Sequence, residues 1–101
     1  MKRNKVVNRI STLMHNIAPT SKVILYGSEA RGDARKDSDI DLIILLEKAD
    51  QKSKWFITDR LLDIEMETGV CLSSYILSYD KWNKKAKTPF LCNVLNEGIT
   101  L

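Results

Sequence analysis

The chain has 101 residues, of which 44% are hydrophobic and 29% charged, as in an ordinary globular domain. Its net charge of +3 is too small to indicate a nucleic-acid-binding surface, so nucleic acid is not an expected partner. No apolar run reaches the ~18 residues that a membrane helix needs, and the basic N-terminus lacks the apolar core of a signal peptide. We therefore expect one domain over residues 1–101, with no membrane partner.

Hydrophobic spacing in the first third of the chain predicts a helix, a strand and a short helical turn. Residues 4–17 carry apolar side chains at helical intervals. Residues 22–26, "KVILY", form a β-rich run that stops at Gly27. Residues 28–34 can form a turn of helix, because Ser28 is a good N-cap residue.

Residues 39–46, "DIDLIILL", form the strongest predicted strand. A period of two places Asp39 and Asp41 on one face of this strand. Both faces become apolar after Asp41, which predicts a central strand that is covered on both sides.

The second half of the chain predicts a long helix and a third strand. The helix spans residues 52–67 and ends near Gly69, and the strand spans residues 70–78. The apolar residues expected to face inward from the helix are Trp55, Ile57, Leu61, Leu62 and Ile64.

The C-terminal quarter predicts two more helical segments. Ser78 or Asp80 caps a short helix that continues to residue 87. Thr88 and Pro89 then start a second helix, which Gly98 closes. The apolar residues of this region pack on the core in preference to forming an interface, and they are Trp82, Phe90, Leu91, Val94 and Leu95. The element order predicts an α/β fold in which helices pack on one small mixed sheet of three strands.

The two cysteines, Cys71 and Cys92, lie among apolar residues and lack a metal-binding or redox spacing. This pattern predicts buried free thiols, which fits a reducing cytoplasm. His15, the only histidine, lies late in the first helix, where we expect a structural or exposed side chain.

The acid pair that opens the central strand predicts a metal site. Because Asp39 and Asp41 share one face, their carboxylates can converge, and converging carboxylates repel unless a cation lies between them. Mg²⁺ prefers hard oxygen ligands and completes its coordination with water and substrate phosphates. Asp39 and Asp41 are therefore the candidate metal ligands and catalytic residues.

The turn at Gly27 and Ser28 predicts a phosphate site. Glycine permits close approach of the backbone to a ligand, and a helix that starts at Ser28 directs free N–H groups toward an anion. If strand 22–26 and strand 39–46 are neighbours, this turn faces Asp39 and Asp41. Such a pair of half-sites would hold a Mg²⁺-nucleotide by its phosphates.

The motif "GS" at residues 27–28, ten residues and then "DSDIDL" at residues 37–42 resembles the G-S-x10-D-x-D signature of the nucleotidyltransferase superfamily that includes DNA polymerase β. The stretch "GSEARGDARKDSDIDLIIL" is similar to the minimal nucleotidyltransferases of prokaryotes, small antitoxin-like proteins often partnered with HEPN toxins. The strong match covers about twenty residues, and element order and length extend the likeness over most of the chain.

The resemblance implies a role for each matching residue. Gly27 and Ser28 would hold the triphosphate of a nucleotide, and Asp39 and Asp41 would bind the divalent metals. Arg31 matches a frequent family arginine that supports the loop or approaches the phosphates, while a structural salt bridge explains it equally well. The implied cofactor is Mg²⁺ and the implied substrate is a nucleoside triphosphate, with ATP preferred.

One expected family feature is missing from the sequence. Active members place a third carboxylate on a later strand, whereas the corresponding "GVCLSSYILS" contains no acid, and Ser73 and Ser74 are the only polar residues inside it. We expect the other acids near these motifs to be solvated or capping residues, namely Asp33, Asp37, Asp63, Glu65 and Glu67.

Three functions remain open on the sequence. The first is an enzyme that transfers AMP from ATP to a hydroxyl of a protein or small molecule, with a HEPN-type protein as its partner. The second is a binding module of little or no turnover, because the third carboxylate is absent. The third, a purely structural domain, leaves the Asp39 and Asp41 pair unexplained. A homo-oligomer is also left open.

Overall fold

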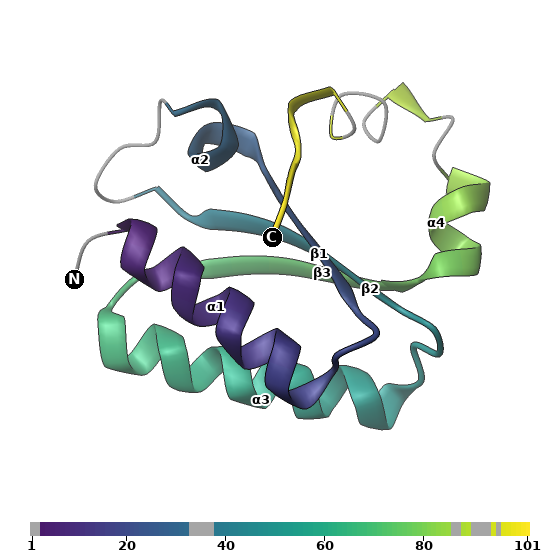
Figure 1. Cartoon of the computed structure of the whole chain (residues 1–101), viewed down its shortest axis with the longest axis horizontal. Helices are drawn as coiled ribbons and strands as arrows, with labels where there is room; N and C mark the ends of the chain where they lie inside the picture. Colours follow the sequence, from purple (N-terminus) through teal and green to yellow (C-terminus); the bar gives the residue numbers. More distant parts are fainter. Residues whose placement is uncertain (1–2, 33–37, 86–87, 90–93, 95) are drawn as a thin grey trace.

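The computed structural model describes residues 3–32, 38–85, 88–89, 94 and 96–101. Figure 1 shows a sheet with α1 and α3 together on one side, α2 near one end and α4 near the other. The helices and strands in chain order are α1 (Arg3–Ile17), β1 (Lys22–Tyr26), α2 (Gly27–Arg31), β2 (Ile40–Leu46), α3 (Gln51–Thr68), β3 (Leu72–Ser78), α4 (Tyr79–Lys85) and β4 (Ile99–Thr100).

The four strands form a mixed sheet in the order β3-β2-β1-β4. β2 pairs antiparallel with β1 and parallel with β3, so it is a central strand as predicted. The expected α/β fold with helices on a small mixed sheet is confirmed.

The fourth strand, β4, was not predicted. It has two residues, which pair antiparallel with Leu25 and Ile24 of β1, and the Leu101 amide donates to the Val23 carbonyl at 2.8 Å. Two residues are too few to produce an alternating pattern, so only the paired backbone reveals this strand.

Each face of the sheet carries its own core. Even-numbered residues of β2 face α1 and α3, and odd-numbered residues after Asp41 face α4 and Val94. The buried residues of the first core are Val6, Ile10, Met14, Val23, Leu25, Ile40, Leu42, Ile44, Leu46, Ile57, Leu61 and Ile64. Those of the second are Ile24, Tyr26, Ile43, Leu45, Trp82 and Val94.

The inward face of α3 differs from the prediction. Ile57, Leu61 and Ile64 are buried, but Trp55 is 67% exposed and Leu62 is 46% exposed. At 100° per residue, the three buried side chains form one stripe, and Trp55 and Leu62 lie on the opposite side of the helix. The prediction for these two residues was wrong because apolar residues occur on both sides of α3.

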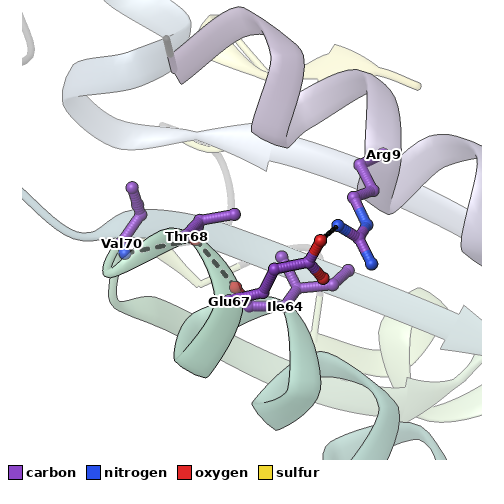
Figure 2. Close-up of polar contacts among 5 residues, drawn as sticks. All are labelled: Arg9, Ile64, Glu67, Thr68 and Val70. Carbon is purple, nitrogen blue, oxygen red and sulfur yellow. Dashed lines mark hydrogen bonds and ion pairs between the residues drawn. The ribbon is translucent and has the colours of Figure 1, made fainter. Parts of the chain in front are cut away.

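Both ends of α3 are closed by local hydrogen bonds. The Asp50 carboxylate accepts from the Ser53 amide at 2.8 Å, and Gly69 adopts a left-handed conformation at the C-terminus with φ of 74°. Figure 2 shows the Thr68 hydroxyl donating to the Ile64 carbonyl at 2.7 Å and accepting from the Val70 amide at 3.2 Å.

A salt bridge ties α1 to α3. Arg9 and Glu67 form an ion pair between the two helices (Figure 2). The hydrogen bond from Arg9 holds the pKa of the Glu67 carboxyl below its usual range. Both side chains are partly exposed, so the pair adds little stability to the packing of α1 on α3.

Asp50→Ala is expected to lower the melting temperature by roughly 5 °C at neutral pH, because it removes the N-cap of α3. The bond to Ser53 lowers the pKa of Asp50 in the folded state. Its contribution is therefore present above the unfolded pKa of about 3.9 and is lost as the pH falls through the lower folded value. Thermal unfolding between neutral and acidic pH checks this. The exposed Asp59 of α3 is the control, and an equal effect of Asp59→Ala would contradict the capping role.

The C-terminal region packs on the second core. The Ser78 hydroxyl accepts from the Lys81 amide at 3.1 Å, so Ser78 caps α4, while Asp80 pairs with Lys84 at 3.2 Å. Trp82 and Val94 are buried, which confirms core packing for these two residues. The remaining predicted packing residues, Phe90, Leu91 and Leu95, lie outside the described part of the chain.

The prediction of buried cysteines is wrong for Cys71, which is a free and exposed thiol. Cys71 lies directly before the edge strand β3, where its apolar sequence neighbours do not cover it. Cys92 lies outside the described residues, and the cytoplasmic location stays a prediction. His15 is exposed in the last turn of α1, as expected. Within the described ranges, no helix combines the length and apolar character required to cross a membrane.

Candidate functional site

The pairing of β1 with β2 brings the two predicted half-sites together. Tyr26, the last residue of β1, lies opposite Asp41 in the antiparallel register. The next residue, Gly27, begins α2, which contacts both strands. The turn and the acid pair therefore lie at the same end of the sheet, where Figure 1 shows α2 beside the start of β2.

Asp39 and Asp41 interact through their charges. Asp39 is exposed immediately before β2, and Asp41 is half-buried as the second residue of the strand. Burial raises the pKa of Asp41 above its usual range, the negative charge of Asp39 raises it further, and the positive charge of Arg31 opposes both. The ionised pair is thus unfavourable by itself, which is the electrostatic condition that a bound cation relieves.

Gly27 lies directly against the Asp41 carboxylate. Its φ of 73° belongs to the left-handed region that favours glycine. A Cβ atom at this position would collide with the Asp41 Oδ2 atom. Two features therefore favour glycine at this position: the left-handed backbone of the turn, and the Asp41 carboxylate in the space that a side chain would need.

Gly27→Ala is expected to destabilise the protein more than Gly69→Ala. Gly69 has nearly the same φ, 74°, but no heavy atom lies within 4 Å of the position of its added Cβ. Gly69→Ala should cost about 1–2 kcal/mol through the left-handed backbone alone, and Gly27→Ala should add the cost of displacing Asp41. Urea unfolding of both variants measures the difference. Asp41→Gly in the Gly27→Ala background should remove most of the excess, and equal costs for the two alanines would contradict this packing.

The remaining predicted nucleotide-binding residues lie on α2. Ser28 is its second residue, but the structure does not describe its side chain. Arg31 ends α2, and its guanidinium donates to Glu97 at 3.1 Å in a partly exposed salt bridge. The salt bridge considered from the sequence is thus present, while a contact between Arg31 and phosphate stays a prediction.

The parallel pairing of β3 identifies the residue beside Asp41. Ser73 lies next to Asp41 on the same face, whereas Ser74 lies next to Leu42 on the face toward α1 and α3. The position on β3 that adjoins the acid pair therefore carries a hydroxyl. A serine can donate a hydrogen bond there, but it brings no negative charge to a metal.

Sequence reasoning missed two tyrosines on the site face. Tyr26 lies opposite Asp41, and Tyr75 lies two residues beyond Ser73 on the same face. Burial raises the pKa of Tyr26, and the charges of Asp41 and Tyr75 raise it further. Tyr75 is 57% exposed. The antiparallel register would have located Tyr26, because its Gly27 neighbour had already been assigned to the site.

The three acids that precede β3 are engaged elsewhere. Glu65 accepts from the Leu72 amide at 2.7 Å, Glu67 pairs with Arg9, and Asp63 lies 3.9 Å from Arg60. Asp33 and Asp37 lie outside the described residues. In the part of the chain that the structure describes, no three His, Cys, Asp or Glu side chains are grouped closely enough to hold a metal ion.

The residues present fit Mg²⁺ with two protein ligands. The donors would be the carboxylates of Asp39 and Asp41, whose mutual repulsion favours a divalent cation. Because Gly27 has no side chain, the Asp41 carboxylate can lie directly beside the turn that is the candidate phosphate site. Mg²⁺ is commonly held by one or two carboxylates together with substrate phosphates and water.

A family model described as "Polymerase beta, Nucleotidyltransferase" matches residues 8–101. The chain belongs to this nucleotidyltransferase family. Among its relatives is a protein of Methanocaldococcus jannaschii that is provisionally named protein adenylyltransferase MJ0604. It is 35% identical over 80 residues, which cover 79% of this chain and 76% of the relative. The predicted family is therefore confirmed.

Solved structures share this nucleotidyltransferase fold. One, provisionally described as a minimal nucleotidyltransferase, is 28% identical, with a TM-score of 0.66 over 100% of this chain and 97% of the other. A second is a chain from the complex described as tri-AMPylated Shewanella oneidensis HEPN toxin with MNT antitoxin. It is 17% identical, with a TM-score of 0.58, and covers 98% of this chain and 71% of the other, a likeness of fold alone.

A hollow at the other end of the sheet is separate from the acid pair. It has a volume of about 440 Å³ and lies where β2 ends at Leu46 and α3 begins. Lys48, Lys52 and Phe56 are among its lining residues. Since Asp41 lies at the start of β2, this hollow belongs to the opposite end of the strand.

Proposed function

We propose that the protein is a Mg²⁺-dependent nucleotidyltransferase that transfers AMP from ATP to a hydroxyl group of a partner protein. The observation that carries the proposal is the Asp41 carboxylate, which lies against Gly27 at the turn into α2 and is close enough to Asp39 for the charge of Asp39 to raise its pKa. The 35% identical relative named as a protein adenylyltransferase supports AMP as the transferred group.

The chain's residues have distinct roles in this reaction. The turn at Gly27 and Ser28 holds the triphosphate through backbone N–H groups, and Asp39 and Asp41 hold Mg²⁺. The metal, when bound, neutralises negative charge on the phosphates as it develops. The acceptor oxygen bonds to the α-phosphorus of ATP, the bond from that phosphorus to the bridging oxygen breaks, and pyrophosphate leaves. The acceptor's proton is lost to solvent or to a base of the partner, because Ser73 beside Asp41 is no base.

The proposed partner is a HEPN-type protein, with this chain as the antitoxin of the pair. The fold is shared with a chain from a complex of an MNT antitoxin with an AMPylated HEPN toxin.

A binding module of low turnover is the second candidate. Ser73, the β3 residue beside Asp41, supplies neither a charged metal ligand nor a strong base. In that case the protein would bind Mg²⁺-ATP and its partner without modifying either.

Incubation with Mg²⁺ and α-labelled ATP, together with the protein encoded by the adjacent gene, tests the proposal. Label on that partner, lost in Asp41→Asn and retained in the exposed control Asp80→Asn, is the expected result. Tight ATP binding without label on the partner would favour the binding module. Neither labelling nor ATP binding would contradict both candidates.

A further inference from the structure

The outer side of α3 carries an uncovered apolar stripe. Of the six large hydrophobic residues that are exposed in the described part of the chain, four belong to this helix, namely Trp55, Phe56, Leu62 and Met66. Trp55, Leu62 and Met66 are 67%, 46% and 79% exposed, and their spacing of seven and four residues places them on one side of the helix. We call these three residues the outer stripe. It is about 16 Å long, and it lies opposite Ile57, Leu61 and Ile64.

Phe56 is not part of the outer stripe. The Arg60 guanidinium lies over its ring, 5.7 Å from the centroid, so this aromatic side chain already has a cationic partner. The outer stripe is therefore the apolar surface of α3 that the described residues leave without cover.

The charges beside the outer stripe run against the helix dipole. Lys52 lies in the first turn, while Asp59 and Asp63 lie farther along on the same flank. The first turn of α3 contains no acidic residue and the last turn no basic residue. A helix dipole favours the reverse order, acids first and bases last. Apart from the exposed pair of Arg60 with Asp63, this order of charges gains nothing within the helix itself.

The same order of charges suits a second α3 in the antiparallel direction. Two identical helices related by a two-fold axis place the N-terminal half of each beside the C-terminal half of the other. Lys52 of each copy then lies beside Asp63 of the other, and Trp55 lies beside Leu62. The two Asp59 side chains meet near the two-fold axis, so one like-charge contact stands against two opposite-charge pairs. A parallel arrangement would put both Lys52 residues at one end of the helix pair and both Asp63 residues at the other, so neither would have the opposite charge of the other copy beside it.

We propose that the outer stripe is a self-association surface, on which a second copy of this chain packs its own α3 in the antiparallel direction. The outer stripe lies on the side of the sheet that α1 and α3 cover, whereas Asp41 is on the opposite face, which carries Ile43 and Leu45. The dimer therefore leaves both acid pairs open. The proposal does not depend on the proposed reaction.

Sedimentation equilibrium of the purified chain over a wide concentration range tests the association. A reversible dimer with twice the 11.5 kDa monomer mass is expected. Trp55→Asp should raise the dissociation constant by at least about tenfold, because a buried tryptophan commonly dominates an interface. Tyr75→Asp, which alters an exposed aromatic residue on β3, is the matched control and should leave the mass distribution unchanged.

Charge exchange tests the antiparallel direction. Lys52→Asp and Asp63→Lys should each weaken the dimer about tenfold through like-charge contacts. The two changes combined in one chain should restore association, since each copy again places opposite charges together. An equimolar mixture of the two single variants should also form a heterodimer.

Several results would overturn the proposal. One is a monomer at every concentration, and another is a dimer that persists in Trp55→Asp. A third is a dimer that Lys52→Asp and Asp63→Lys each weaken but that does not return when the two changes are combined, which contradicts the antiparallel arrangement. If the outer stripe instead binds the protein encoded by the adjacent gene, Trp55→Asp will abolish that complex while the purified chain shows no self-association. That result would also overturn the proposal. Far-UV circular dichroism verifies that each variant is folded.

Discussion

Asp41→Asn is expected to abolish the Mg²⁺-dependent stabilisation of the protein by ATP. A ligand that binds only the folded state, at a hundred times its dissociation constant, adds about 2.7 kcal/mol, and the melting temperature of a domain this size then rises by roughly 10 °C or more. Asp41 is the half-buried member of the acid pair and lies against Gly27. In the proposed function, its loss removes a metal ligand beside the phosphate turn. Thermal unfolding with ATP, with and without Mg²⁺, measures the effect.

The ligand-free protein should respond in the opposite direction. Burial and Asp39 raise the pKa of Asp41 in the folded state. A group of this kind contributes stability below its unfolded pKa of about 3.9 and loses it as the pH rises through the higher folded value. At neutral pH the charged Asp41 therefore costs stability, and Asp41→Asn should raise the melting temperature in metal-free buffer.

Asp80→Asn, on the exposed surface of α4, is the control for both measurements. It should keep the full shift produced by Mg²⁺ and ATP and leave the ligand-free melting temperature nearly unchanged. If Asp41→Asn retained the same Mg²⁺-dependent shift, the acid pair would not be the metal site.

Ser73→Asp is expected to raise the rate of AMP transfer. The register places residue 73 beside Asp41 on the same face of the sheet, so an introduced carboxylate joins the acid pair. A positioned base contributes about 10²–10⁴-fold to a rate, and the lower end of that range is the expected gain. Transfer from α-labelled ATP to the partner, followed over time, measures it.

Ser74→Asp is the matched control. The same change one residue later places the carboxylate beside Leu42, toward the core under α1 and α3, where it cannot reach a metal between Asp39 and Asp41. It should destabilise the fold and leave transfer no faster. Ser73→Asp should also lower the melting temperature without Mg²⁺ and restore it with Mg²⁺. If Ser73→Asp has no effect on rate and the wild type is already fast, the chain does not lack a carboxylate at this position.

Much of the candidate site follows from the sequence because its signals are local. Gly27 and Ser28 mark the end of β1, and a period of two assigns Asp39 and Asp41 to one face of β2. Their meeting requires only that consecutive strands pair, which is common in small sheets. The sequence identifies Ser73 as a polar residue of β3. Its position beside Asp41 depends on the parallel register of β2 and β3, which no residue of β3 indicates.

The errors arise where an apolar residue has two structural explanations. Trp55 and Leu62 are apolar members of an amphipathic helix, but they lie on the side away from the sheet. Cys71 has apolar sequence neighbours and is still exposed, because it precedes an edge strand. An apolar side chain favours burial, but its position in the packed structure decides whether it is buried.

A crystal structure of the protein with Mn²⁺ and a non-hydrolysable ATP analogue tests the central claim most directly. We predict an anomalous peak between the carboxylates of Asp39 and Asp41, at about the 2.1 Å expected for Mg²⁺ ligands, with the triphosphate at the turn of Gly27 and Ser28. Nucleotide bound instead in the hollow beside Lys48 and Phe56, with no ion at Asp39 and Asp41, would contradict the assignment of this site.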